Sequence, residues 1–178
     1  MLFPGGRLPL RVFEKRYIDM ARECLRGSAP FGVCLIVEGR EVGDPAVPAS
    51  VGTLAKIVEC DMAQLGVLQI VAQGERRFKI AARRVQPDGL VRATVELLGE
   101  EADAPVAAER VASVQLLQRI IAQHAALFPA QPRLDSSAWV SARLAELLPL
   151  PLALKQELLE MDDAVARLAR VHALLAGA

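Results

Sequence analysis

Hydrophobic and polar positions change their period part-way along the chain. Up to about Leu98 the apolar runs are short and mostly strand-like, and after Pro105 apolar residues recur at helical spacing. Strand runs followed by helix runs favour an α+β fold over an alternating α/β fold. We therefore predict a small β-barrel in residues 1–98 and an α-helical bundle in residues 106–178.

The strand-rich half contains one predicted helix, between Glu14 and Arg26. Its apolar residues follow helical steps, and Gly27 comes next as a C-terminal stop. The other apolar runs of this half predict a buried strand in 31–37, strands starting at Val51 and Gly66, a half-buried strand in 77–85 and a strand starting at Leu90. In the strand 77–85, Phe78, Ile80 and Ala82 are expected to face the core.

The helical half follows an acidic linker, "GEEADAP", in residues 99–105. The first helix is marked by Val111, Val114, Leu117, Ile121 and Phe128. The next helix is expected to have Asp135 or Ser136 as its cap and to bury Trp139 or Val140, then Leu144, Leu147 and Leu148. Two more helices are predicted in 152–161 and 163–175, the second capped by Asp162.

Composition narrows the possible functions. The chain has 178 residues, 53% of them hydrophobic, and its 21 basic side chains balance 21 acidic ones. Nothing in that balance attracts nucleic acid or an anionic membrane. The chain has three cysteines, with no C-x-x-C pair, and two histidines, so a zinc site is not expected. The sparse cysteines suit a reducing cytosol. Without a signal peptide or an apolar run near the ~20 residues of a membrane span, we expect a soluble, cytoplasmic protein.

Catalytic motifs are absent from the sequence. There is no G-x-S-x-G element and no glycine-rich phosphate loop. His124 and His172 both lie in helical runs, where a semi-buried histidine is commoner than a general base. No cofactor and no metal is expected. A Ser–Lys pair stays open as an alternative, because such pairs form in space rather than in sequence.

A basic cluster on two neighbouring predicted strands is the main sign of nucleic acid. Such a face can track a phosphate backbone, but RNA-binding sites usually add aromatic platforms, and Phe78, the aromatic residue among these cations, is expected in the core. We therefore favour a solvated basic face over an RNA site. The cluster consists of Arg76, Arg77, Lys79, Arg83, Arg84 and Arg92.

The stretch "RLPLRVFEKRY" (residues 7–17) joins a strand to the predicted helix. Leu8, Leu10 and Val12 alternate with Pro9 and Arg11, which is the period of a strand. Glu14 then falls at the helix start, where a carboxylate complements the helix dipole, and Arg16 can pair with a carboxylate nearby. A structural junction accounts for these residues without catalytic chemistry.

These segments also carry a family resemblance. "LFPGGRLPLRVFEKRYIDMARECL", "FGVCLI", "VGTLAKIVE" and "GERRFKI", followed by "WVSARLAELLPLPLALKQELLEMDDAVARL", closely resemble the N-terminal substrate-binding domain of Lon proteases, in order and over nearly the whole chain. The resemblance implies a PUA-like β-barrel followed by a helical bundle. It also implies recognition of unfolded or tagged protein substrates.

The chain differs from that family in two respects. It ends at Ala178 with neither an ATPase nor a Ser–Lys protease part, so it resembles the stand-alone Lon-domain proteins. Family members usually carry one more strand, similar to Ile-Pro-Leu-Phe-Pro, before the Leu-Phe-Pro-Gly-Gly element. We therefore expect the natural start to lie upstream of Met1, and an edge of the barrel to be left unpaired here.

The sequence thus predicts a non-catalytic module that binds unfolded or extended polypeptide segments, with a separate protease or chaperone as a further partner. Nucleic acid and membranes are not expected partners, and the oligomeric state is left open. The alternatives are a PUA-like RNA-binding module and a hydrolase with a Ser–Lys pair. The candidate peptide-binding residues are Leu10, Arg11, Phe13, Tyr17, Arg76, Arg77 and Phe78.

Overall fold

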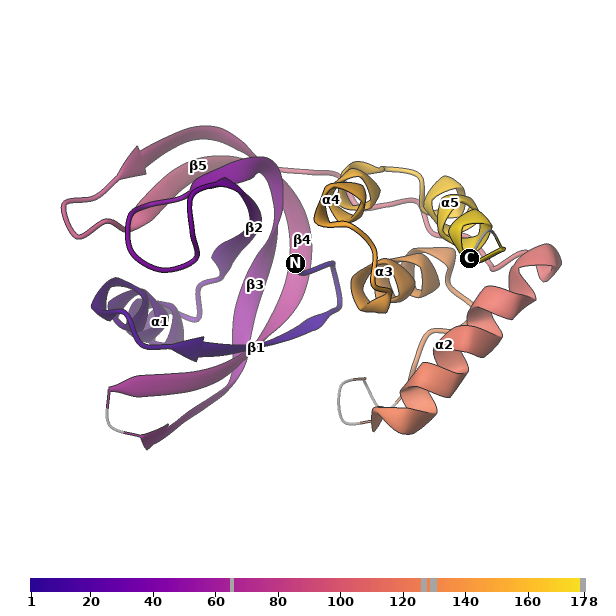
Figure 1. The fold of residues 1–178 in the computed structure, drawn as a ribbon, viewed down its shortest axis with the longest axis horizontal. Coiled ribbons are helices and arrows are strands. Elements are labelled where there is room, and N and C mark those ends of the chain that lie inside the picture. Colours follow the sequence, from indigo (N-terminus) through magenta and orange to yellow (C-terminus); the bar gives the residue numbers. More distant parts are fainter. Residues whose placement is uncertain (65, 126–127, 129–130, 177–178) are drawn as a thin grey trace. The chain divides into compact units, whose positions relative to one another are not determined.

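The computed structural model describes residues 1–64, 66–125, 128 and 131–176. The chain divides into two compact units (Figure 1), which we call the sheet unit, Met1–Gly99, and the helical unit, Glu100–Ala178. Strands and one helix make up the first unit and helices the second, so the predicted α+β class is confirmed.

The sheet unit is built on one antiparallel sheet of five strands. The strand order is β1-β4-β3-β2, with β5 also paired to β4, and these pairings leave the sheet open rather than closed into a barrel. The elements are β1 Arg7–Val12, α1 Lys15–Gly27, β2 Phe31–Glu38, β3 Val47–Gln64, β4 Val67–Val85 and β5 Val91–Leu97.

Strand β4 corrects the sequence prediction of two separate strands, one starting at Gly66 and one in 77–85. The chain does not turn between them but continues as one strand. Its first half pairs with β1, from Leu68 to Gln73, and its second half pairs with β5, from Phe78 to Val85. One long strand therefore positions both of its shorter neighbours.

The core of the sheet unit lies where α1 covers the sheet (Figure 1). Val12, Leu68 and Ile70 are buried there with Ala21 of the helix, so the alternation predicted for β1 is confirmed. A second buried cluster forms from Leu2, Ala55 and Ala72. The first residues of the chain thus lie inside the unit, with Leu2 1% and Phe3 0% exposed.

Gly74 of β4 makes this burial possible. A β carbon on Gly74 would lie 2.3 Å from the carbonyl oxygen of Phe3, closer than real contacts allow. The backbone instead forms hydrogen bonds on both sides of this crossing, from the Gly5 nitrogen to the Gly74 oxygen and from the Gly74 nitrogen to the Gly6 oxygen. A glycine is needed here because two backbone segments touch.

Two local expectations for the sheet unit were wrong. The left-handed residue that ends α1 is Ser28, with φ 49°, and not Gly27, which still belongs to the helix. Strand β2 was predicted to be buried, but its residues are half-buried or exposed, because it is the outermost strand on its side of the sheet. A continuous apolar run did not distinguish an outer strand from a central one.

The helical unit contains a 3-10 turn and, after it, the helices that the period predicts. Ser136 caps α3 as expected, accepting a hydrogen bond from the Trp139 nitrogen, 3.0 Å away. The elements are η1 Ala108–Arg110, α2 Val111–Gln123, α3 Ser137–Leu147, α4 Leu152–Glu160 and α5 Ala164–Ala176.

Three details of the helical prediction were wrong. Phe128 lies beyond the end of α2 and packs against Trp139, with ring centroids 6.5 Å apart. Leu147 at the end of α3 is 36% exposed rather than buried, although Val140 and Leu144 are buried as predicted. Asp163 rather than Asp162 caps α5, because its Oδ1 accepts from the nitrogens of Val165 and Ala166.

Arg167 of α5 joins most of the helical unit. Its side chain is 1% exposed, and its guanidinium donates to both carboxylate oxygens of Glu101, in the segment predicted as a linker. It also donates to the Ser141 hydroxyl at 3.0 Å and to the carbonyl oxygens of Ala138 and Met161. The acidic segment 99–105 is therefore held against the helices at Glu101, because a buried arginine needs a negatively charged partner.

We predict that Gly74→Ala destabilises the sheet unit by about 1–3 kcal/mol, because the new methyl group forces the Phe3 backbone away from β4. Thermal unfolding followed by circular dichroism measures this change. Gly99→Ala is the control, since a β carbon there meets nothing within 4 Å. Equal melting temperatures for the two variants would show that the crossing at Gly74 relaxes freely.

We also predict that Arg167→Ala costs the helical unit about 3–5 kcal/mol, because it removes a buried guanidinium together with its ion pair to Glu101 and its hydrogen bond to Ser141. Arg170→Ala is the matched control on the same helix. Arg170 pairs with Glu157 at the exposed surface, and its loss should cost less than about 1 kcal/mol. Urea titration of the helical circular dichroism signal compares the two, and similar midpoints would contradict the role given to Arg167.

Candidate functional site

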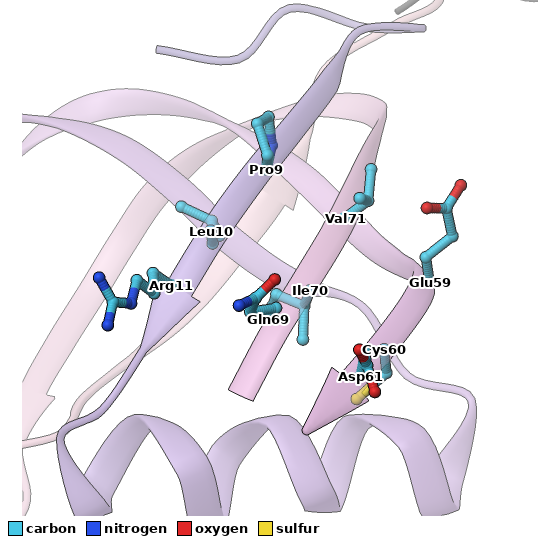
Figure 2. A pocket seen from close by; sticks show the side chains of 9 residues that line it. All are labelled: Pro9, Leu10, Arg11, Glu59, Cys60, Asp61, Gln69, Ile70 and Val71. Atoms are coloured by element: carbon cyan, nitrogen blue, oxygen red, sulfur yellow. The ribbon is translucent and has the colours of Figure 1, made fainter. Parts of the chain in front are cut away.

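A shallow pocket of about 490 Å³ opens on the sheet unit, across three adjacent strands. Figure 2 shows that its lining comes in three short segments, one each from β1, β4 and β3. We call this surface the three-strand face. It is lined by Pro9, Leu10, Arg11, Glu59, Cys60, Asp61, Gln69, Ile70 and Val71.

Strand register explains why residues so far apart in sequence meet here. In three successive rows across the strands, β1 pairs with β4 and β4 pairs with β3. A shift in register between Ile57 and Glu59 precedes the contribution of β3. The rows are Pro9–Val71–Glu59, Leu10–Ile70–Cys60 and Arg11–Gln69–Asp61.

The three-strand face carries charges of both signs. Arg11 is exposed on β1, and Glu59 and Asp61 are exposed on β3. Glu59 forms an ion pair with Arg7, and Asp61 accepts a hydrogen bond from the Met62 nitrogen at 2.8 Å. Because these groups stay solvated, they can orient a polar partner without a large desolvation cost.

The sequence-predicted residues near the N-terminus fall around this face. Leu10 and Arg11 line the pocket, and Leu10 also packs against the core. Phe13 follows the end of β1 and is 53% exposed. Tyr17 is half-buried on α1 against the same core cluster, under the Arg16 guanidinium, 4.8 Å from its ring centroid.

The other predicted residues lie elsewhere. Phe78 is 2% exposed, and its ring occupies the space that β carbons on Gly32 and Gly52 would need. Arg77 is 3% exposed, and the exposed Arg76 donates to the carbonyl oxygen of Leu98 at 3.0 Å. Because Arg77 and Phe78 are inside the unit, they cannot belong to a binding surface in this structure.

Sequence reasoning missed most of the lining, namely Pro9 and the residues from β3 and β4. The missing information was the register between strands, which no single segment encodes. One signal was present, since Glu59, Cys60 and Asp61 form a polar run at the end of an apolar strand. Such a run inside a long strand indicates an exposed sheet face.

Arg16 explains the charged cluster that follows β1. It is 8% exposed and donates to the carbonyl oxygens of Gly43 at 2.6 Å and Gly89 at 3.0 Å. Its guanidinium also pairs with Glu14, 2.8 Å away. One side chain therefore fastens two loops to the start of α1, and the cluster is a structural junction rather than a reaction centre.

Four serines, Ser113, Ser136, Ser137 and Ser141, form side-chain hydrogen bonds with other parts of the helical unit. Ser113, which bonds to His172 Nδ1 at 2.8 Å, is fully buried, so that pair cannot meet a substrate. Ser141 bonds to Arg167, and the amine of Lys155 donates to the Glu146 carbonyl oxygen at 2.7 Å. Within the described ranges, no serine is bonded to a lysine and no cluster of histidine, cysteine and carboxylate groups could hold a metal.

The predicted basic face is interrupted in the structure. Arg77 is buried, and Arg92 pairs with Glu23 at 2.7 Å. Lys79 stands opposite Glu96 in the register of β4 and β5. Phe78, the aromatic residue among these cations, is buried and cannot stack on a base. The arrangement therefore lacks the stacking surface that it would supply, which is typical of RNA-binding sites.

A second hollow of about 450 Å³ lies along α2, beside Gln115, Gln118, Arg119 and Ala122. Its described lining comes from a single helix face, whereas three strands build the three-strand face. We therefore regard the three-strand face as the better candidate.

None of the helices in the described part of the chain is long and apolar enough to cross a membrane.

Comparisons with known proteins agree over the whole length. A family model described as the ATP-dependent protease La (LON) substrate-binding domain matches residues 1–177. The crystal structure of a Lon N-terminal domain protein from Xanthomonas campestris is 38% identical, with a TM-score of 0.79, and the match covers 99% of this chain and 92% of that one. The predicted resemblance is thereby confirmed.

Curated relatives include longer proteins. A Lon protease of Cytophaga hutchinsonii is 29% identical over 94% of this chain, and protein cereblon of Gallus gallus is 32% identical over 56% of it. In each case the match covers 22% of the relative. The chain therefore spans about a fifth of the length of these relatives.

We predict that Cys60 reacts with a thiol reagent well before the other cysteines. Burial raises the pKa of Cys34 to about 11, so at pH 8 that thiol holds about two orders of magnitude less thiolate than at the ordinary value of 9.0. Burial, and next the Glu23 carboxylate, also raise the pKa of Cys24. Peptide mapping after brief iodoacetamide treatment measures the order, and Cys60→Ser should remove the fast reaction. Equal labelling of all three cysteines would contradict the exposure given to the three-strand face.

Proposed function

This chain belongs to the LON substrate-binding domain family, and on that premise we propose that it binds extended segments of other proteins and catalyses no reaction on them. The partners we propose are unfolded or extended polypeptides, with a separate protease or chaperone as the further recipient. We place this activity in the cytoplasm. Several of the longer relatives, among them that of Cytophaga hutchinsonii, carry the name Lon protease.

The three-strand face is the observation that carries the proposal. Its volume of about 490 Å³ falls within the range of ligand pockets, and it is shallow enough to admit a main chain that runs along it. The half-buried Leu10 and Val71 give it apolar surface, and charges of both signs lie at its rim. A partner with mixed side chains, such as an unfolded polypeptide, suits that combination better than a small rigid ligand does.

RNA binding is the alternative function. It is supported by four exposed cations of β4, namely Arg76, Lys79, Arg83 and Arg84. In the register of β4 and β5, Lys79 stands opposite Glu96 and Arg84 stands opposite Arg92, and Phe78, the aromatic residue of this stretch, is buried. Strong binding by charge alone would depend steeply on salt. We therefore use RNA as the competing ligand in the test rather than as the proposed partner.

We predict saturable binding of labelled, unfolded, aromatic-rich peptides at physiological salt, and no binding of single-stranded RNA. Fluorescence anisotropy of the peptide or the oligonucleotide, titrated with the protein, measures both. RNA binding with a steep salt dependence, together with silent peptides, would overturn the proposal.

The same assay locates the site. A bulky maleimide on Cys60 should weaken peptide binding by about tenfold or more, because it fills the pocket. The matched control is the double variant Cys60→Ser, Arg83→Cys, which carries the same label on the half of β4 that pairs with β5. Equal affinities for the two labelled proteins would move the site away from the three-strand face.

A further inference from the structure

Strand β5 is an outer strand with a single partner. It pairs with the second half of β4, and in the described part of the chain no other strand pairs with it. An edge strand presents a row of backbone N–H and C=O groups, which proteins usually protect with a proline or a bulge. The sequence of β5, "VRATVEL", contains no proline, and all of its residues are half-buried or exposed.

The outer strands β1 and β2 are protected in that way. β1 contains Pro9, which removes one N–H group from the strand. β2 has two shifts in register along its length. The single shift between β4 and β5 puts the extra residue, Ala81, on β4 rather than on β5. The outer edge of β5 is therefore regular and unprotected.

The direction of its backbone groups follows from two hydrogen bonds. The Leu98 nitrogen donates to the Arg77 oxygen at 3.0 Å, and the Gln86 nitrogen donates to the Leu90 oxygen at 2.8 Å. Leu90 and Leu98 therefore point their backbone groups toward β4. The even-numbered residues between them do the same, because the direction alternates along a strand. The outer edge carries the backbone groups of the odd-numbered residues, Val91, Ala93, Val95 and Leu97.

We propose that the outer edge of β5 pairs with the same edge of a second copy of this chain, antiparallel about Thr94, so that the two sheets join into one. A two-fold axis at Thr94 places odd-numbered residues opposite odd-numbered ones, which is the phase that the outward backbone groups require. Val91 then stands opposite Leu97 of the second copy, and Ala93 opposite its Val95. Each outward N–H and C=O group of the strand thereby gains a partner.

Charge selects this register. Arg92 stands opposite Glu96 of the second copy, and Glu96 stands opposite its Arg92, so the strand is complementary to itself. Opposite charges directly across an antiparallel pair stabilise it, as do two facing threonines, here Thr94 of each copy. Moving the axis by one residue in either direction keeps the hydrogen-bond phase but places both charged residues opposite uncharged ones.

The pairing also offsets a repulsion inside the sheet unit. Arg84 of β4 stands directly opposite Arg92 of β5, and like charges in that position destabilise a strand pair. Glu23 of α1 offsets part of the repulsion, with its carboxylate 2.7 Å from Arg92. In the dimer, Glu96 of the second copy adds another carboxylate to the same row. That row then reads Arg84, Arg92, Glu96 and Lys79, with the last two from the second copy.

The dimer contact and the three-strand face use different parts of the sheet. No residue of β5 lines the three-strand face, which lies along the half of β4 that pairs with β1. Each copy in the dimer therefore brings its own face. A polypeptide long enough to reach both faces gains from the effective concentration of the second one.

An exchange of charge tests the register. We expect the intact 178-residue chain to dimerise with a dissociation constant of about 1–100 µM, because the contact is one short strand per copy. Arg92→Glu and Glu96→Arg each bring like charges together across the axis, and each should weaken dimerisation by about tenfold. Mixed in equal amounts, the two variants should recover the wild-type affinity, because every facing pair is then opposite in charge.

Sedimentation velocity over a concentration series measures these affinities. Lys56→Glu is the control, an equal change of charge at an exposed position of β3, which does not pair with β5. It should dimerise as the wild type does. Recovery in the mixture is a readout that a purely structural role of Arg92 or Glu96 would not produce.

A disulfide at the axis supplies the second readout. In this register Thr94 faces Thr94 of the second copy without backbone hydrogen bonds, so their α carbons lie about 4.5 Å apart, within reach of a disulfide. In a Cys60→Ser background, Thr94→Cys should form a covalent dimer on mild oxidation, seen by non-reducing electrophoresis. Leu97→Cys is the control on the same strand. Its two copies lie about 20 Å apart and should not cross-link.

The outcomes separate this inference from the proposed function. A chain that stays monomeric at about 100 µM overturns the dimer, as does a dimer that Thr94→Cys fails to cross-link or whose charge variants do not recover on mixing. Peptide binding by a monomeric chain would leave the proposed function intact. Dimerisation through Thr94 without any peptide binding would support the inference and contradict the proposed function.

Discussion

The close approach of Phe3 to Gly74 is the constraint on which the sheet unit depends. Because no β carbon separates the two backbones, the chain before β1 lies directly against β4, and Leu2 and Phe3 enter the core. That contact fixes where β1 begins, and therefore which residues of β1 stand opposite which residues of β4. The three-strand face is a product of this register, so its composition follows from a contact several residues away.

Sequence periods predicted the elements well and the surfaces poorly. The alternation of Leu8, Leu10 and Val12 and the helical spacing after Pro105 were reliable, because each reflects a face buried within one element. The pocket could not be predicted from the sequence, because Asp61 and Gln69 lie in one row with Arg11 only through the register between strands. Arg77 was assigned to a solvated face for a related reason, because period alone does not reveal a charged side chain with partners inside the unit.

Buried arginines serve the architecture of both units. Arg16 fastens two loops in the sheet unit, and Arg167 collects the acidic segment, α3 and the end of α4 in the helical unit. Arg143 is also buried, beside Glu146, and burial lowers its pKa. Planar guanidinium groups with several donors can satisfy carbonyl oxygens from separate segments at once. Because these arginines are buried, the number of basic residues in the sequence overstates the positive charge that the protein surface presents to a nucleic acid.

The contact between Phe128 and Trp139 has a practical consequence. The sequence contains one tryptophan and one tyrosine, and they lie in different units, with Trp139 on α3 and Tyr17 on α1. Each unit thus carries its own intrinsic chromophore, and the tilted phenylalanine ring gives the indole an asymmetric environment. Near-ultraviolet spectra can follow the two halves of the chain separately, without labels, in any experiment that perturbs one of them.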